Sequence, residues 1–335
     1  MSISQTSNIE EERIQAFSDK ISQLKQEIAK TVVGQEDNIE MILTAILANG
    51  HILIEGMPGV AKTLTTKLIA KLIDASFNRI QFTPDLMPSD VVGTTVYNMK
   101  EQEFSFHRGP VFANIVLADE INRAPAKTQA ALLEAMEERQ VTVDGNTYPM
   151  ERLYTILATQ NPIEQEGTYR LPEAQLDRFV MKINMDYPQA KEELEILKRY
   201  NANQMINTLE HISPILTPEE IINMRQLAND VYVDDSLIEY IVNIIQQTRN
   251  SKNVYLGAST RATVAILKVS KAYALIQGRD FVTPEDIKHV APYIIKHRIT
   301  ITAEAEMEGY TPEKVTTRLI ERVHIPEKYN KQTNN

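Results

Sequence analysis

The residues best suited to chemistry form a short loop that contains two glycines and ends in a lysine and a threonine. The apolar run from His51 to Ile54 leads into this loop, and apolar residues at helical spacing follow it. Backbone N–H groups of such a loop can bind a polyphosphate, while Lys62 reaches the outer phosphates and the Thr63 hydroxyl holds Mg²⁺. The predicted nucleotide-binding residues of the loop are Gly56, Pro58, Gly59, Val60, Ala61, Lys62, Thr63 and Leu64.

The loop departs from the usual phosphate-binding pattern at residue 61, where alanine replaces the glycine that normally precedes the lysine. If Ala61 has helical backbone angles, its methyl group costs little; if the loop needs a positive φ there, the cost is larger. The sequence leaves both alternatives open. The apolar run before the loop and the helical pattern after it favour a phosphate-binding loop over a chance match.

A pair of acidic residues further along the chain supplies the remaining chemistry. The apolar run from Asn114 to Leu117 leads through one alanine into Asp119 and Glu120. An acid at the end of a buried strand next to a phosphate loop can complete the Mg²⁺ site, so we assign Asp119 as a metal ligand together with Thr63. Glu120 can then polarise an attacking water as general base. The alternative is a solvated acidic pair that opens the next helix, and the phosphate loop upstream favours the catalytic interpretation.

A parallel sheet is the element that would bring the loop and the acids together. Short apolar runs alternate with longer helical patterns, which predicts an α/β fold with helices on both faces of the sheet. The runs are 51–54, 79–82, 114–117 and 154–158. A β-hairpin is predicted at residues 139–150, because Asp144-Gly145 is a strong turn signal between alternating residues.

Helical segments flank this α/β region on both sides. An apolar stripe that includes Phe17, Ile21 and Leu24 predicts an amphipathic helix within residues 1–30 that packs on the core. After residue 187 the strand signal fades, and Thr-Pro pairs at Thr217, Thr283 and Thr311 are typical of helix starts. The predicted organisation is an N-terminal helix at 1–30, an α/β core at 31–186 with inserts at 85–111 and 139–150, and an all-helical domain at 187–335.

Composition restricts the compartment and the partners. The chain has no cysteine, no signal-like N-terminus and no apolar run near the roughly 20 residues that span a bilayer, so we expect a soluble, cytoplasmic protein. The net charge of −10, without a local basic patch, weighs against nucleic acid as a partner. The six histidines lack close ligand spacing, and we assign no zinc site.

Four motifs in order along the chain resemble those of the MoxR-type AAA+ ATPases. They are the phosphate loop, LADEINRAPAK at 117–127, ATQNP at 158–162 and LPEAQLDRF at 171–179, and the likeness runs from about Val32 to Ile301. The resemblance implies an AAA+ α/β core with a small helical lid.

The resemblance also implies roles for residues that the motifs do not explain by themselves. Asn161 matches the sensor 1 asparagine that orients the attacking water, and Arg178 matches an arginine that reaches the neighbouring subunit's γ-phosphate. Arg261, in GASTRA at 257–262, matches the sensor 2 arginine, which contacts the nucleotide of its own subunit. Val33 and Gly34 match the adenine-side contact. The plainer alternatives are an Asn-Pro turn at 161, a surface ion pair with Asp177 at 178 and an ordinary helix start at 261.

The family's activity gives the functional expectation. The resemblance implies an ATPase with ATP and Mg²⁺ as ligands, assembled as a homo-oligomeric ring that we expect to be a hexamer. It also implies chaperone-like remodelling, maturation or metal loading of a partner protein, often one with a von Willebrand factor A domain. Both inserts would line or rim the pore of the ring.

Other classes of function remain as alternatives. One is a nucleic-acid motor, against which the acidic balance and the absence of a basic hairpin tip at Asp144, Gly145 and Asn146 speak. Another is a monomeric P-loop switch or small-molecule kinase, in which Arg178 would be structural. A protease-coupled unfoldase is a nearer variant, but residues 85–111 lack a clear aromatic-glycine pore loop.

Overall fold

A five-stranded parallel sheet forms the centre of the first domain. The structure is a computed structural model that describes residues 3–100, 102–161, 168–202 and 212–330. The strand order is β2-β5-β8-β1-β9. The bounds are β2 (Phe77–Gln81), β5 (Ile115–Asp119), β8 (Thr155–Gln160), β1 (Ile52–Gly56) and β9 (Met181–Met185). Because all neighbours pair in parallel, the carboxyl ends of the strands meet at one edge of the sheet.

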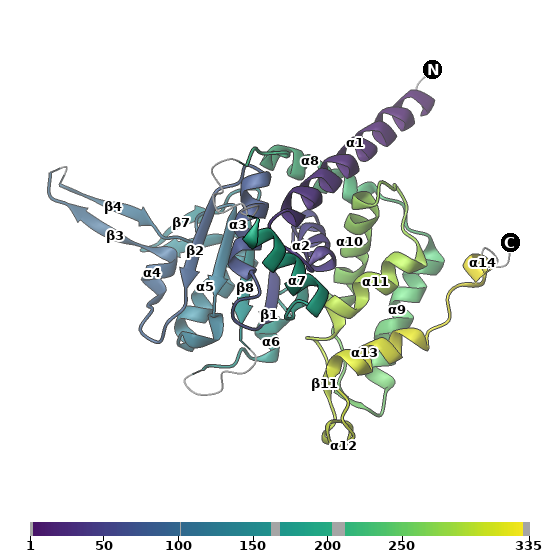
Figure 1. Ribbon diagram of the computed structural model, residues 1–335. Coiled ribbons are helices and arrows are strands. Elements are labelled where there is room, and N and C mark those ends of the chain that lie inside the picture. The colour runs from purple at the N-terminus through teal and green to yellow at the C-terminus, as the bar shows by residue number, and fades with distance from the viewer. Residues whose placement is uncertain (1–2, 101, 162–167, 203–211, 331–335) are drawn as a thin grey trace.

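Helices cover both faces of the sheet (Figure 1), as the alternation of apolar runs and helical patterns predicted. Side chains of β1 alternate between two apolar cores, with Ile52 and Ile54 on one side and Leu53 on the other. The first core includes α1 (Ile3–Ala29), α2 (Glu36–Leu47) and α3 (Lys62–Leu72), and the second includes α5 (Ala126–Glu138). Burial of both faces explains why the central strands read as continuous apolar runs.

The long helix at the N-terminus packs on the body of the molecule through one apolar stripe. Within α1 the buried stripe consists of Ile14, Phe17, Ile21, Leu24 and Ile28, and it faces the larger of the two cores. The first turns of α1 extend away from the body of the molecule (Figure 1). None of the helices in the described ranges combines the length and apolar character needed to cross a membrane.

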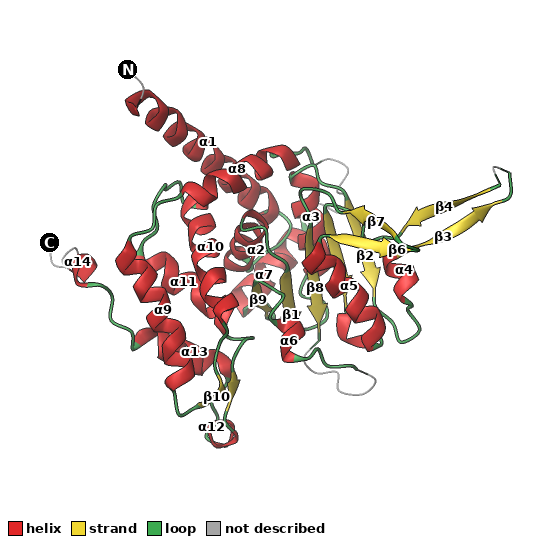
Figure 2. Ribbon diagram, turned by 180° about the vertical axis from the view of Figure 1, so that it is seen from behind, coloured by secondary structure: helices red, strands yellow, loops and turns green. Residues whose placement is uncertain are grey.

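Two β-hairpins interrupt the α/β alternation. The predicted one consists of β6 (Gln140–Val143) and β7 (Asn146–Pro149), with positive φ at both Asp144 and Gly145, as a tight hairpin turn requires. The other follows α4 (Pro88–Val92) and consists of β3 (Gly93–Asn98) and β4 (Glu103–Arg108). Figure 2 shows that β3 and β4 project far from the sheet. The sequence indicated an insert at residues 85–111 but not the hairpin within it.

The second domain is helical, with one short two-stranded ribbon that the sequence did not predict. Its helices are α7 (Ala190–Asn201), α8 (Pro218–Asp230), α9 (Asp235–Asn250), α10 (Thr260–Ile276), α11 (Pro284–Ile295), α12 (Ala303–Met307), α13 (Pro312–Glu321) and α14 (Glu327–Asn330). The ribbon pairs β10 (Val254–Leu256) with β11 (Thr300–Ile301). Thr217, Thr283 and Thr311 are the predicted N-caps, and each accepts a hydrogen bond from the first turn of its helix.

Candidate nucleotide site

The phosphate loop lies at the carboxyl end of β1 and runs directly into α3. Gly56 ends the strand, and a Cβ there would come within 2.4 Å of the Met185 carbonyl oxygen on β9, so only glycine fits. Gly59 has φ +85°, and Lys62 is the first residue of α3. The Lys62 ammonium donates a hydrogen bond to the Gly56 carbonyl oxygen at 2.7 Å. This contact folds the lysine over the loop, where the outer phosphates of a nucleotide would bind.

Ala61 adopts the more costly of the two conformations considered for it. Its backbone angles are φ 62° and ψ 18°, in the left-handed region, at the N-cap position of α3. A left-handed conformation costs a residue with a Cβ about 1–2 kcal/mol. The loop therefore keeps the shape that a glycine would give it and carries strain at this position.

Asp119 and Glu120 lie at the same edge of the sheet as the phosphate loop. In the register of the sheet Ala118 is level with Ala158, which is level with Leu53, so Asp119 lies level with Ile54, two residues before the loop begins. One strand, β8, separates β5 from β1, which corresponds to roughly 10 Å at the usual spacing of neighbouring strands. A magnesium-bound triphosphate fits across that separation.

Three side chains that sequence analysis did not single out hold the acidic pair. Arg79 donates to Asp119 Oδ2 through Nη2 at 2.6 Å and through Nε at 3.1 Å, and the Thr159 hydroxyl donates to Oδ1 at 2.6 Å. Gln81 Nε2 donates to Glu120 Oε2 at 3.0 Å. Arg79 and Gln81 are two residues apart on β2 and so lie on one face of that strand. Their spacing was visible in the sequence, but the order of the strands was not.

Glu120 has a strained backbone and, besides Gln81, a basic partner. It lies in the left-handed region at φ 57°, between β5 and the 3₁₀ turn Ile121–Arg123. Its Oε2 also pairs with Arg123 Nε at 3.1 Å, and its N–H donates to Thr159 Oγ1 at 2.9 Å. Strained residues of this kind are often found at functional sites. The side chain is thus oriented by its neighbours rather than left to solvent, unlike the solvated acidic pair of the alternative interpretation.

The remaining predicted residues of the site come from β8 and from the segment before α2. Asn161 follows β8 directly and is buried, so it lies between the ends of β5 and β1. Val33 and Gly34 precede α2, and Gln35 Nε2 donates to the Asp186 carbonyl oxygen just beyond β9. Gly34 has φ +77°, and a Cβ there would contact the Glu192 carboxylate of α7. This segment therefore lies beside the carboxyl ends of β1 and β9.

Arg178 and Arg261 lie together at the opposite edge of the sheet. Arg178 Nε pairs with Glu137 Oε2 at 2.8 Å, and Arg261 Nη2 pairs with Glu137 Oε1 at 2.7 Å. Both arginines line a cavity with His51, which precedes β1, whereas the phosphate loop follows β1. The residues from His51 to Gly56 span about 16 Å at the usual rise of a strand. Arg261 is thus brought to Arg178, and this arrangement differs from the expected contact with the nucleotide of its own subunit.

The residues around Asp119 fit a magnesium ion by their chemistry. Thr63 is in the first turn of α3, and Asp119 is a buried carboxylate at the facing strand end. Each carboxylate oxygen has two acceptor positions, so the hydrogen bonds from Arg79 and Thr159 leave acceptor capacity for a hydrated cation. Hydroxyl, carboxylate and water oxygens are the ligands that Mg²⁺ prefers.

A phosphate loop after the inner strand β1 of a five-stranded parallel sheet, with acids two strands away at the end of β5 and a helical lid, defines the class of AAA P-loop proteins. Comparison with protein families agrees with this fold. Residues 51–181 match the ATPase family associated with various cellular activities (AAA), and residues 246–319 match the AAA lid domain.

Similarity to individual proteins places the chain more narrowly within the AAA family. The chain is 42% identical over 310 residues to chaperone MoxR1 of Mycobacterium tuberculosis, covering 90% of this chain and 81% of that protein. It is 48% identical over 299 residues to the uncharacterized protein YeaC of Bacillus subtilis, covering 89% and 92%, and 30% identical over 313 residues to protein MoxR of Methylorubrum extorquens, covering 87% and 90%. A crystal structure of a protein from Cytophaga hutchinsonii superposes with a TM-score of 0.87 at 43% identity, and the match covers 96% of this chain and 99% of that one. The chain belongs to the MoxR family of AAA ATPases.

Proposed function

We propose that this protein hydrolyses ATP with Mg²⁺ at the boundary between two copies of the chain and uses the energy to remodel a protein client. The observation that carries the proposal is the convergence of the phosphate loop, Asp119, Glu120 and Asn161 at one edge of the sheet. Their chemistry matches the needs of phosphoryl transfer to water, which are charge stabilisation, a bound metal and an oriented nucleophile.

Each residue of the site has a separate task in this reaction. Lys62 and the loop N–H groups bind the phosphates, and Thr63 with Asp119 would hold the Mg²⁺ that neutralises their charge. Glu120 accepts the proton of the attacking water, and Asn161 orients that water from the end of the intervening strand. Val33 and Gly34 contact the base on the side of β9.

The two arginines act on the nucleotide of a neighbouring copy. Arg178 and Arg261 share Glu137 at the edge of the sheet away from the phosphate loop. The length of β1 separates both arginines from the phosphate loop of their own subunit. A neighbour that presents its phosphate-loop edge to this cluster would bring its γ-phosphate to both guanidinium groups. Such an arginine stabilises transition-state charge and is worth about 10³–10⁵ in rate in other NTPases.

The assembly and the client follow from the family. If each subunit contributes arginines at one edge and receives those of its neighbour at the other, the interface between subunits is heterologous. A closed set of such interfaces forms a ring, which we propose to be a hexamer. We propose units at residues 1–30, 31–186 and 187–335, with the lid moving against the core on hydrolysis. The name of the chaperone relative supports a protein client. A client with a von Willebrand factor A domain, or one loaded with a metal, is the form we propose.

Three variants test the mechanism together. We expect Lys62→Ala to abolish ATP binding, Glu120→Gln to bind ATP without turnover, and Arg178→Ala to bind ATP normally but hydrolyse it at least about 10³-fold more slowly. The measurements are equilibrium binding of a fluorescent ATP analogue and steady-state phosphate release. Unchanged turnover in Glu120→Gln would refute the assigned general base. A pull-down with Glu120→Gln held in ATP then identifies the client.

A further inference from the structure

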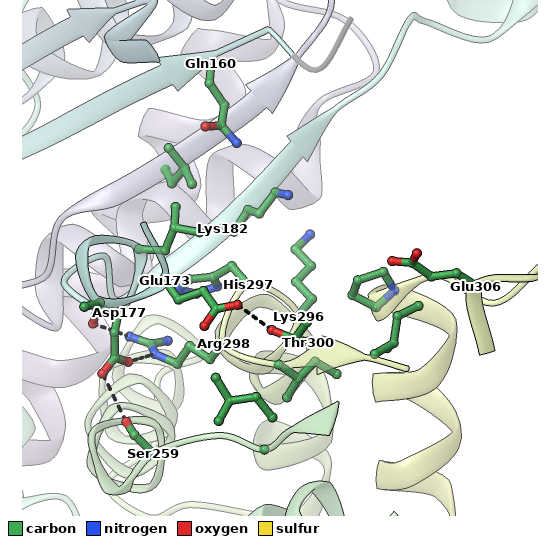
Figure 3. Close-up of a pocket in the computed structure, with 18 residues that line it drawn as sticks. Gln160, Glu173, Asp177, Lys182, Ser259, Lys296, His297, Arg298, Thr300 and Glu306 are labelled. Atoms are coloured by element: carbon green, nitrogen blue, oxygen red, sulfur yellow. Dashed lines mark hydrogen bonds and ion pairs between the residues drawn. The ribbon is translucent and has the colours of Figure 1, made fainter. Parts of the chain in front are cut away.

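The lid holds the segment that carries Arg178. We call residues 173–180 the finger segment; they comprise α6 (Glu173–Leu176) and the four residues before β9. Figure 3 shows the lid residues Ser259, Arg298 and Thr300 reaching this segment. The contacts come from two places in the lid, the start of α10 and the stretch that runs from the end of α11 into β11.

Arg298 makes the largest set of these contacts. Its Nε donates to Asp177 Oδ1 at 2.7 Å, and Nη2 donates to the carbonyl oxygens of Asp177 and Phe179 at 3.2 and 2.6 Å. Nη1 donates to the carbonyl oxygens of Val180 at 3.0 Å and Ile294 at 2.7 Å. All five N–H groups of the guanidinium are thereby used. The side chain is only 3% exposed, so it is fixed in both position and direction.

Three further lid side chains support this contact. His297 Nε2 lies 3.1 Å from the Phe179 carbonyl oxygen, and since that atom can only accept, the ring donates from Nε2. Burial holds the pKa of His297 well below its usual value, so the ring is neutral. The Ser259 hydroxyl donates to Asp177 Oδ2 at 3.1 Å, and Thr300 Oγ1 donates to Glu173 Oε1 at 2.8 Å.

These contacts fix the chain on both sides of Arg178. Among the described residues, the side-chain partners of the Asp177 carboxylate are Arg298, Ser259 and Arg261, and all three belong to the lid. The carbonyl of Phe179 accepts from two lid residues, while its ring is buried in the core. Arg178 itself pairs with the core residue Glu137. A cavity of about 540 Å³ lies beside the finger segment, between α6 and the lid.

We propose that Arg298 is a positioning residue for Arg178, and that through it the lid of one subunit sets hydrolysis in the next. The inference rests on the proposed role of Arg178 across the subunit boundary and extends it. A guanidinium that binds the carbonyls of Asp177, Phe179 and Val180 at once cannot be replaced by a lysine, whose ammonium is a point charge with three donors. Loss of these contacts displaces Arg178, and a displacement of about 1 Å can cost about 100-fold in rate.

The first test compares Arg298→Lys with a matched lid variant. Arg279 forms a two-pronged ion pair with Asp286 at 2.5 and 2.8 Å entirely within the lid, so Arg279→Lys removes similar contacts without touching the finger segment. We expect Arg298→Lys to lower kcat about 10- to 100-fold with unchanged ATP affinity, and Arg279→Lys to leave kcat within about twofold. Ser259→Gly, which a helix N-cap tolerates, is a milder second variant and should lower kcat several-fold. A loss of ATP affinity in both Arg298→Lys and Ser259→Gly would overturn the proposal.

The second test uses mixed assemblies, purified in sequence on two affinity tags so that each contains both subunits. Lys62→Ala subunits cannot bind ATP but present an intact Arg178 to their neighbour. They should therefore restore the turnover of Arg178→Ala subunits and, equally, of Arg298→Lys subunits, by at least about fivefold. Adding Arg298→Lys to Arg178→Ala should cause no further loss.

The outcomes separate the two levels of the argument. If Lys62→Ala restores Arg178→Ala but not Arg298→Lys, Arg298 acts on its own subunit and the positioning role is refuted. If neither is restored, or if no assembly with both tags forms, the action of Arg178 across the boundary fails, and with it the proposed mechanism.

Discussion

Replacing Ala61 with glycine should stabilise the protein, because the backbone at residue 61 is left-handed. Relief of the φ 62° conformation is worth about 1–2 kcal/mol. Two effects oppose it. Glycine adds freedom to the unfolded chain, which costs about 0.4–1 kcal/mol, and the half-buried methyl group contributes less than about 0.5 kcal/mol. The net expectation for Ala61→Gly is a stabilisation of about 0.5 kcal/mol.

The reciprocal change at Gly59 gives a matched control in the same loop. Gly59 has φ +85°, and a Cβ there would meet no atom within 4 Å, so Gly59→Ala adds backbone strain without a clash. We expect it to destabilise by about 0.8 kcal/mol, from the same strain less the same entropy difference. The two variants should differ by about 1.3 kcal/mol, with opposite signs.

Thermal unfolding of the nucleotide-free protein measures this difference, since bound ATP would add its own stabilisation. For a chain of this size a gap of a few degrees between the two midpoints is expected, with wild type between them. If both Ala61→Gly and Gly59→Ala have lower unfolding midpoints than wild type, residue 61 is not left-handed in solution. Such a result would refute backbone strain at this position.

Three further outcomes follow from contacts in the structure. His51 accepts from the Ile156 N–H at Nδ1 and faces the Met136 carbonyl oxygen through Nε2, and burial lowers its pKa to about 3. Because the unfolded state takes up the proton first, stability should fall by up to about 1.4 kcal/mol per pH unit below pH 6.5, and His51→Gln should flatten that slope in denaturation measured from pH 7 to 5. Glu137→Gln should change stability by less than about 1 kcal/mol and raise turnover about two- to fivefold in steady-state assays, because it releases both arginines; a fall in turnover would contradict this. Thr63→Ala should bind ATP without Mg²⁺ as wild type does, but Mg²⁺ should no longer raise its affinity for ATP in a titration. An equal loss of ATP affinity with and without Mg²⁺ would show that Thr63 is not a metal ligand.

The central sheet was predictable because its strands are buried on both faces. Asn114–Leu117 and Tyr154–Ala158 read as continuous apolar runs, and β5 and β8 form at those places. The edge strand β9 was missed. Among the described strands it pairs only with β1, and Lys182 and Asn184 alternate with its buried residues, so no apolar run marks it. The β3–β4 hairpin was missed for a related reason, because it projects from the body and buries little apolar surface.

Within the site, the sequence could give residue types but not their relative directions. The motifs predicted the phosphate loop and the acidic pair, whose placement at one edge follows from parallel strands. The φ of Ala61 depends on the loop as a whole, and both alternatives satisfied the pattern. Arg79 reaches Asp119 only because β2 lies next to β5, and strand order is not written in local periodicity. The edge at which Arg261 lies depends on how the lid docks, which involves contacts more than 100 residues apart in the chain.

Glu137 explains how two arginines can lie side by side at one edge of the sheet when no phosphate is bound there. Arg178 and Arg261 carry like charges, and each pairs with a different oxygen of the same carboxylate. Two guanidinium groups converging on a pair of anionic oxygens is also the geometry that binds a phosphate. A γ-phosphate carries more charge than a carboxylate, so it competes favourably for both groups once a neighbouring copy presents it. The carboxylate thus keeps the arginines paired and, in the proposed mechanism, directed at the boundary between two copies, and the cost of displacing it is small because the cluster is partly solvated.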